Sequence, residues 1–370
     1  MQIDQKTNFV KGEEDCLVVS IYTPNVKISE KGKKEIKLLP VFVWLHGGAF
    51  HKGSGNGDYH GPNRIMDYSV VMVTMNFRLG PLGFMSLEED ILPGNLGLWD
   101  QKMALEWIQL NIPSYGGDPT KVTIAGSGAG GVSATLHYLS PQSKGLFRSV
   151  ISFGGSPFTP SMMQTKSPPS YYTRSLAARL SCDFNDTTKG ILECLSSKTS
   201  EGIAKSALMF AKVVDFAPMP FHPIGKTMLL HKVYVTIWLK IVSCISVDRF
   251  ASNPFLPVEP LEALQSRFFN DVPLIVGYNK HESIHMLLPL LKNQTLLKQF
   301  LENWKISGPA ILFNRQVSKY YNKRQKCLQF TNFTGLEMKS RRKTEMSCIY
   351  YTRSTSKMEL QRRALKFLNL

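Results

Sequence analysis

The stretch VTIAGSGAGGVSATLHYL (residues 122–139) joins an apolar run to a helical pattern through a turn of glycine and other small residues. A sharp strand-to-helix turn of this kind pushes one side chain out at its apex, and it requires small residues two positions before and after that apex. The helix that follows supplies backbone N–H donors and the positive end of its dipole. The stretch therefore predicts a nucleophile elbow, a turn that presents a reactive side chain.

Five apolar runs along the chain end abruptly in glycine or polar turns, which is typical of buried strands. The runs end at Gly48, Phe77, Ser127, Gly155 and Tyr278. Because their apolar character is continuous and does not alternate with polar residues, we expect strands that are covered on both faces. This pattern indicates an α/β fold with a mostly parallel sheet and helical crossovers.

The segment of residues 100–111 shows the spacing of an amphipathic helix between two of these strands. The residues predicted on one of its faces are Met103, Ala104, Trp107 and Ile108. An acidic residue, Asp100, stands at its start, where it would favour the helix dipole. The alternation of strand and helix supports the α/β prediction.

Six separated motifs resemble the type-B carboxylesterase family, particularly its arthropod esterases, and they occur in the family's order. The motifs are EDCLVVSIYTP, VFVWLHGGAF, NFRLGPLGF, PGNLGLWDQKMALEWIQLNI, YGGDPTKVTIAGSGAGG and SPQSKGLFRSVIS. The resemblance is dense over residues 14–157 and weaker over residues 158–283. It implies a single α/β-hydrolase domain over residues 1–370, with a mostly parallel central sheet flanked by helices and a cap region around residues 160–211. We expect this fold to be incomplete at both termini.

Two segments depart from the family pattern. Residues 225–250 form an apolar insert whose run is interrupted by His231, Lys232 and Lys240, so a membrane span is not expected. Residues 338–370 form a basic tail, and from residue 315 onward there are 14 Lys and Arg against 3 acidic residues, out of a net charge of +16. Because no aromatic-interleaved motif accompanies these charges, we expect no nucleic-acid partner. An anion- or membrane-binding extension is the alternative for the tail.

The resemblance aligns Gly128 with the family's nucleophilic serine, because the family elbow G-E-S-A-G-G here reads GSGAGG. Glycine has no side chain to attack a carbonyl, so the acyl-enzyme route is unavailable at this position. The fold tolerates the change, because glycine relieves the backbone strain of an elbow. The alternative is that Ser127 is the nucleophile, since the pattern small-x-Ser-x-small is also present one residue earlier.

The resemblance also implies an oxyanion hole formed by the N–H groups of Gly47, Gly48 and Ala129. His46 precedes this glycine pair, and we expect it to stabilise the turn and not to act as a base, because it lies on the wrong side of the family's order of serine, acid and histidine.

The remaining members of the family's catalytic triad match this chain only in part. Glu282 stands at the position of the triad acid, after the run that ends in VGY. No histidine is present from residue 286 to residue 370, so the family's catalytic histidine has no counterpart. A triad without nucleophile and base retains only the contribution of binding and of the oxyanion hole.

Two features indicate an oxidising compartment. The spacing of Cys182 and Cys194 suits a small disulfide ring, which also matches a family disulfide. Glycosylation sequons begin at Asn185, Asn293 and Asn332. We therefore expect a secreted or extracellular protein, although the polar opening MQIDQKTNF is not an export signal.

The sequence leaves three functions open. The first is a carboxylesterase-family protein that is catalytically impaired or inactive and binds a small apolar ester or another hydrophobic ligand. The second is a non-catalytic adhesion or ligand-binding module, similar to the neuroligin-like relatives, with a protein partner. The third is an active esterase that uses Ser127. We expect no metal and no cofactor in any of them.

Overall fold

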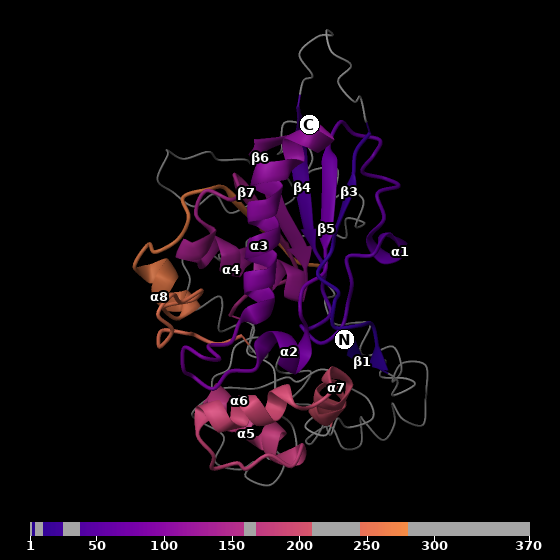
Figure 1. Cartoon of the computed structure of the whole chain (residues 1–370). Coiled ribbons are helices and arrows are strands. Elements are labelled where there is room, and N and C mark those ends of the chain that lie inside the picture. The colour runs from indigo at the N-terminus through magenta and orange to yellow at the C-terminus, as the bar shows by residue number, and fades with distance from the viewer. Residues whose placement is uncertain (1, 4–9, 25–37, 159–167, 209–244, 280–370) are drawn as a thin grey trace, which may run out of the picture.

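The computed structural model describes residues 2–3, 10–24, 38–158, 168–208 and 245–279. Its main feature is a six-stranded sheet in the order β3-β5-β4-β6-β7-β8 (Figure 1). The strands are β3 (Val19–Tyr22), β4 (Leu39–Leu45), β5 (Val71–Met75), β6 (Gly117–Ser127), β7 (Ser149–Phe153) and β8 (Leu274–Gly277). A separate pair is formed by β1 (Gln2–Ile3) and β2 (Val10–Lys11).

The strand directions confirm the predicted α/β architecture. All pairings among β4 to β8 are parallel, and only β3, at the edge, runs antiparallel to its neighbour β5. Each of the five apolar runs in the sequence forms one of these parallel strands. The mostly parallel sheet is the expected consequence of runs that are apolar on both faces.

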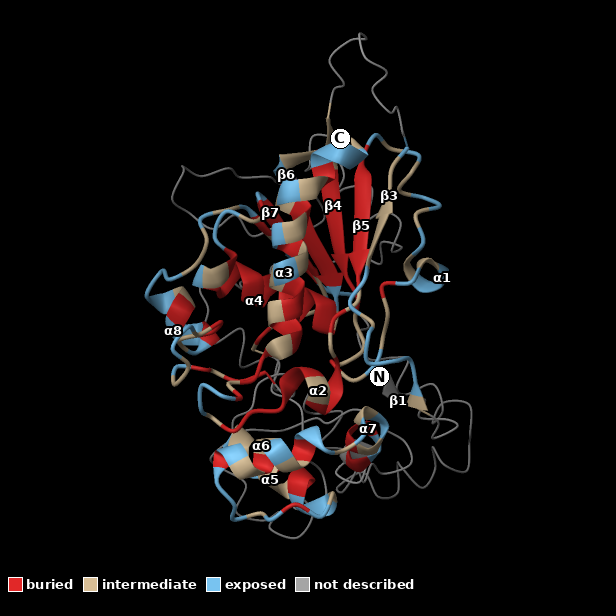
Figure 2. Ribbon diagram, in the orientation of Figure 1, coloured by how far each residue is buried: buried red, intermediate tan, exposed pale blue. Residues whose placement is uncertain are grey.

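The central strands are buried on both faces, as the red strands in Figure 2 show. In β4, Val43 and Leu45 belong to a large core cluster that also takes in side chains of the neighbouring helices, whereas Phe42 and Trp44 belong to a second cluster. Successive side chains of a strand point to opposite faces, so the alternation within β4 assigns one cluster to each face of the sheet.

Two long helices pack with the first of these clusters. They are α3 (Leu96–Asn111) and α4 (Ala129–Leu139) (Figure 1). All residues of α4 are buried, which is the behaviour of a helix enclosed on every side. The shorter helices are α1 (Gly57–His60), α2 (Gly80–Phe84) and α8 (Pro260–Gln265), with 3-10 turns η1 (Ile112–Tyr115) and η2 (Pro141–Ser143).

The structure confirms most of the predicted apolar face of α3, because Ile108 is buried and Ala104 and Trp107 pack against the core, and it corrects the placement of Met103. The helix begins four residues before Asp100, and its buried apolar side is formed by Leu98, Leu105 and Ile108, whereas Met103 is 65% exposed. The carboxylate of Asp100 does not interact with the start of the helix. Instead, it is buried and accepts hydrogen bonds from Arg78, with Nη2 at 2.7 Å and Nε at 2.8 Å. This ion pair links α3 to the segment after β5.

Three helices in the predicted cap region form a group at one end of the sheet, α5 (Pro169–Arg179), α6 (Thr188–Ser196) and α7 (Ser200–Leu208) (Figure 1). Leu176 of α5 and Ile191 of α6 are fully buried in a small apolar cluster of this group, which also includes Met85 after α2. Helix α2 in turn contacts α7. The group is therefore attached to the sheet through the segment that follows β5.

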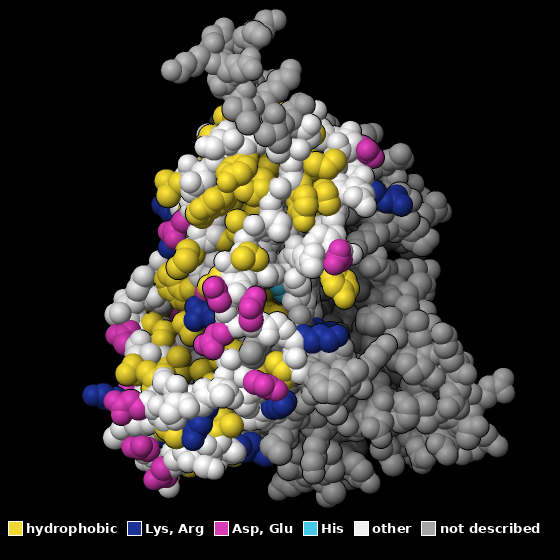
Figure 3. Space-filling model, turned by 45° about the vertical axis from the view of Figure 1, so that its right-hand side comes forward, with side chains coloured by type: hydrophobic (Ala, Val, Ile, Leu, Met, Phe, Trp, Pro, Cys, Tyr) yellow, Lys and Arg dark blue, Asp and Glu magenta, His cyan; other side chains and the backbone are white. Residues whose placement is uncertain are grey.

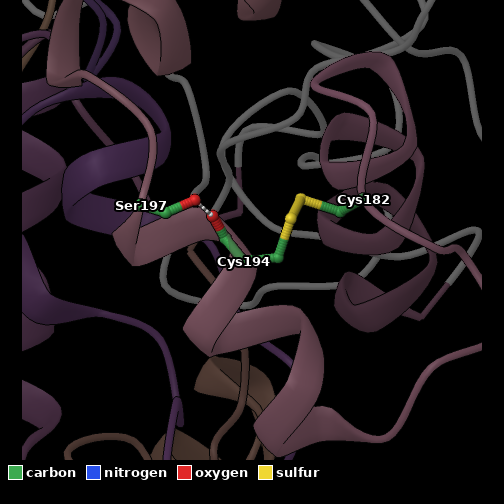
Figure 4. Close-up of a disulfide and its surroundings, with 3 residues drawn as sticks. All are labelled: Cys182, Cys194 and Ser197. Atoms are coloured by element: carbon green, nitrogen blue, oxygen red, sulfur yellow. Dashed lines mark hydrogen bonds between the residues drawn. A yellow bond between two sulfur atoms is a disulfide. The ribbon is translucent and has the colours of Figure 1, made fainter.

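The predicted disulfide joins Cys182, after α5, to Cys194 of α6, with a Cα–Cα distance of 5.9 Å (Figure 4). The hydroxyl of Ser197 donates to the carbonyl of Cys194 at 2.7 Å, just after α6 ends. Among the described residues, Cys16 is a free cysteine. The disulfide closes the polar loop between α5 and α6.

Several predicted features fall partly or wholly outside the described residues. They are the apolar insert, apart from residues 245–250, and the whole basic tail.

Among the described helices, none is long and apolar enough to cross a membrane. On the described face in Figure 3, basic side chains are interspersed with acidic ones, in keeping with the small net charge of the chain before residue 315.

Candidate functional site

The predicted elbow is present between β6 and α4. Strand β6 ends at Ser127, helix α4 begins at Ala129, and Gly128 between them has φ 57° and ψ −121°. The N–H of Gly128 donates to the carbonyl of Phe153 on β7 at 3.0 Å, and its carbonyl accepts from Val132 at 2.9 Å. Gly128 is therefore the apex, held by the sheet on one side and by the first turn of α4 on the other.

The small residues two positions either side of the apex are required by close backbone packing. A Cβ atom added at Gly126 would overlap the backbone of Gly130, and one added at Gly130 would overlap the carbonyl of Leu45. Any larger residue at these two positions would push α4 away from the sheet. The glycine spacing in the sequence thus reflects the distance between α4, β6 and β4.

The apex itself has free space. A Cβ atom added at Gly128 would have no atom within 4 Å, so a side chain would fit there. A side chain at this position would destabilise the fold through backbone strain, because residues other than glycine rarely adopt a φ of 57°. The turn keeps the shape of an elbow, while its apex carries no reactive atom.

Ser127 lies one residue before the apex. It is the last residue of β6, is exposed, and pairs in register with Phe153. Its neighbour Gly126 faces α4, so the alternation of side chains along a strand directs Ser127 to the opposite face of the sheet. The one-residue shift that would bring Ser127 to the apex is absent from this structure.

The turn after β4 carries backbone strain of the kind that clusters at functional sites. Three successive residues, Gly48, Ala49 and Phe50, have φ values of 127°, 55° and 61°. Phe50 is buried and packs edge-on against Phe84, with ring centroids 4.9 Å apart. The buried ring anchors the strained turn.

This turn lies against the start of α4. A Cβ atom added at Gly47 would be 2.5 Å from the carbonyl oxygen of Ser127 and 3.9 Å from the backbone nitrogen of Ala129. No described residue accepts a hydrogen bond from the N–H of Gly47, Gly48 or Ala129. Of the three residues predicted for the oxyanion hole, Gly47 therefore lies against the start of α4, next to Ala129, and Gly48 follows Gly47 in the same turn.

His46 supports this turn from within the protein. It is 1% exposed, its Nδ1 donates to the carbonyl of Gly47 at 2.9 Å, and its ring stacks on Phe77 with centroids 4.4 Å apart. Burial lowers the pKa of His46 from 6.5 to about 4, opposed by the hydrogen bond to Gly47 and assisted by the charge of His60. The ring is consequently neutral near pH 7 and acts as a structural group of the turn.

Comparison with known proteins decides the family. The profile of the Carboxylesterase family matches residues 1–369. The chain belongs to the carboxylesterase family. It is 38% identical to venom carboxylesterase-6 of Apis mellifera over 321 residues, which cover 84% of this chain and 52% of that protein. It is 36% identical to juvenile hormone esterase of Tribolium castaneum over 305 residues, covering 82% and 47%, and 41% identical to esterase FE4 of Myzus persicae over 309 residues, covering 83% and 49%.

The chain spans about half the length of the curated relatives that it matches. The matched family range includes the apolar insert and the basic tail. Glu282, at the predicted triad acid position, lies outside the described residues, as do the sequons at Asn293 and Asn332. Asn185 is exposed and lies within the loop that the disulfide closes.

Two buried groups near the elbow were missed by sequence reasoning: one ties α4 to α3, and the other lies in the loop after β7. In the first, His137 of α4 donates from Nε2 to Gln101 Oε1 of α3 at 3.0 Å and accepts at Nδ1 from the hydroxyl of Ser143 at 2.7 Å. Gln101 also donates to the hydroxyl of Ser133 at 3.2 Å. Burial lowers the pKa of His137 from 6.5 to about 3, with a smaller contribution from the charge of Lys102. This network ties α4 to α3 through a neutral imidazole.

In the second, the hydroxyl of Ser152 on β7 donates to the carbonyl of Gly155 at 2.7 Å. A Cβ atom added at Gly155 would overlap the carbonyl oxygen of Gly128, so this loop lies directly against the apex. Single polar residues inside apolar runs carry little pattern in a sequence, which is why neither group was predicted.

Proposed function

We propose that this chain is a carboxylesterase-family protein that binds carboxylic esters or related apolar ligands without hydrolysing them through an acyl-enzyme. The observation that carries the proposal is the glycine at the elbow apex, with φ 57° and open space where a nucleophilic side chain would stand. An acyl-enzyme requires a nucleophilic oxygen or sulfur at this point, and glycine supplies neither.

The rest of the elbow supports binding without turnover. Gly47 lies against the start of α4 and next to Ala129, and backbone N–H donors at such a place polarise a carbonyl oxygen. In serine hydrolases that have lost their triad, binding and the oxyanion hole alone retain roughly 10³ to 10⁴ over the reaction in water. Any hydrolysis by this chain is expected to stay within that residual range.

A disulfide in the described structure supports an extracellular location. Disulfides persist in oxidising compartments, and one of the relatives is named as a venom carboxylesterase. We extend this location to the present chain as part of the proposal, together with glycosylation of the exposed Asn185.

The proposal is tested with a fluorophosphonate probe, which labels activated serines whatever their substrate. The folded chain is treated with the probe and assayed in parallel for hydrolysis of p-nitrophenyl butyrate. We expect no labelled serine and no rate above that of a Ser127→Ala variant, which serves as the matched control. Labelling of Ser127, or a rate that the Ser127→Ala change abolishes, would show that the neighbouring serine is the nucleophile.

A further inference from the structure

The loop between α5 and α6 carries the Asn185 sequon inside the ring that the Cys182–Cys194 disulfide closes (Figure 4). We propose that Asn185 receives its glycan only while this ring is open, so that the modification precedes closure of the loop. The inference rests on the extracellular location in the proposed function, and it does not depend on the loss of hydrolysis.

The transfer of a glycan involves two groups of the sequon. The donor is a lipid diphosphate-linked oligosaccharide. Its anomeric carbon forms a bond to Nδ2 of Asn185, the bond from that carbon to the diphosphate breaks, and the lipid diphosphate leaves while the amide nitrogen gives up one proton. Because the sequon also requires a hydroxyl two residues later, the transferase must recognise the hydroxyl of Thr187. Both groups therefore have to be available to the enzyme at once.

The folded structure uses the hydroxyl of Thr187 for another purpose. Thr187 is the N-cap of α6, and its hydroxyl oxygen accepts from the N–H of Gly190 at 3.1 Å. The N–H of Thr187 donates to Oδ1 of Asp186 at 2.6 Å. Because the cap satisfies one of the free N–H groups at the start of the helix, a transferase that takes hold of this hydroxyl has to uncap α6.

Arg174 of α5 holds the backbone on both sides of Asn185. Its Nη1 donates to the carbonyl of Phe184 at 3.1 Å and to the carbonyl of Asp186 at 2.6 Å. The N–H of Asn185 donates to Oδ1 of Asp183 at 2.9 Å. The sequon is exposed, yet its backbone is hydrogen-bonded at three successive residues. It therefore cannot change its conformation to fit an enzyme without breaking these bonds.

The disulfide fixes the ends of the same loop. Cys182 is buried in the apolar cluster that also contains Leu176 and Ile191, so the ring is anchored by packing as well as by the covalent bond. Closure passes two electrons from the two thiols to a disulfide oxidant of the compartment, with the loss of two protons. Before that step, the local opening that frees the sequon requires less free energy.

The test compares the rates at which an oligosaccharyl transferase, supplied with a lipid-linked oligosaccharide, modifies the folded oxidised parent and the double variant Cys182→Ser with Cys194→Ser. Occupancy is measured by mass spectrometry of the tryptic peptide of residues 180–189, which contains only the Asn185 sequon. We expect the parent to react at least about tenfold more slowly, because its loop must open before each transfer. Cys16→Ser, which leaves the ring closed, should match the parent. Equal rates for the parent and the double variant would overturn the inference and leave the proposed function intact.

Arg174→Ala keeps both cysteines and tests the inference even if the double variant does not fold. It removes the donor to the two carbonyls beside Asn185. We expect this variant to react faster than the parent, because fewer bonds must break before the sequon can enter the enzyme. A rate equal to that of the parent would contradict the inference.

The same peptide is then analysed in chains secreted from insect cells behind an added export signal. We expect the double variant to carry at least as much glycan at Asn185 as the parent, because its loop stays open throughout synthesis. Less glycan in the double variant would count against the inference. The absence of glycan from both chains would overturn the glycosylation included in the proposed function instead.

Discussion

The elbow and the α5–α7 helix group are held together by different means. At the elbow, backbone meets backbone, because Gly126 and Gly130 leave no room for a Cβ atom between β4, β6 and α4. In the α5–α7 group, a disulfide and a small cluster of apolar side chains hold three short helices. The first region depends on the absence of side chains, and the second depends on their presence.

This difference explains how the elbow keeps its shape without a side chain at position 128. Gly128 takes part in the elbow through its backbone N–H and carbonyl alone, and nothing lies within 4 Å of the position of a Cβ atom. A different side chain at this position would therefore leave those backbone contacts in place.

The largest effect is expected from breaking the backbone packing of the elbow. Gly130→Ala places a Cβ atom against the carbonyl of Leu45, which is backbone and cannot rotate away. We expect a loss of at least about 3 kcal/mol in the free energy of unfolding, measured by urea denaturation. A loss below about 1 kcal/mol would show that α4 can move away from β4 and that the packing is less rigid than described.

The α5–α7 group is tested by removing its covalent link. The double variant Cys182→Ser with Cys194→Ser opens a loop with a sequence separation of 12, which corresponds to about 3 kcal/mol of chain entropy. We expect that loss in thermal unfolding, with Cys16→Ser, at the free cysteine, as a control that changes little. Hydrogen exchange of α4 should stay as slow as in the parent; faster exchange there would contradict the separation of the two regions.

Acid is expected to affect the elbow before the α5–α7 group. The pKa of His137, in the helix that follows the elbow, is lowered from 6.5 to about 3, so the unfolded state takes up a proton below pH 6.5 while the folded state does not. This contribution to stability is complete above pH 6.5 and declines as the pH falls toward 3, by about 2 kcal/mol between pH 7 and 5. No histidine lies in residues 168–208, so that group has no equivalent. Urea denaturation across this pH range should show a smaller decline for His137→Gln than for the parent; an equal decline would exclude this histidine as the cause.

The smallest effect is expected at the apex itself. Gly128→Ala and Gly145→Ala each introduce a Cβ atom at a positive φ, 57° and 80°, into open space. We expect each to cost about 1 to 2 kcal/mol, through backbone strain alone. Matching losses in urea denaturation would confirm that nothing fills the apex. A clearly larger loss for Gly128→Ala would mean that the apex is already occupied.

Much of the fold was predictable, because continuous apolar runs and glycine turns are local signals. All five predicted parallel strands and the elbow between β6 and α4 are present. Met103 was wrongly predicted on the buried face of α3, and the ion pair of Asp100 with Arg78 was not predicted, because these residues are 22 positions apart in the chain. The hydrogen bonds of His137 were not predictable either, since they join residues from three separate segments.

The sequence by itself determined the sheet, the family and the identity of the residue at position 128, because each of these is written in residue types and their local order. Only the tertiary structure decided that Gly128 and not Ser127 lies at the apex, and that the turn after β4 brings Gly47 to the start of α4. The physical reason is that a site of backbone donors depends on φ values and on the approach of distant segments, neither of which is encoded by any single residue.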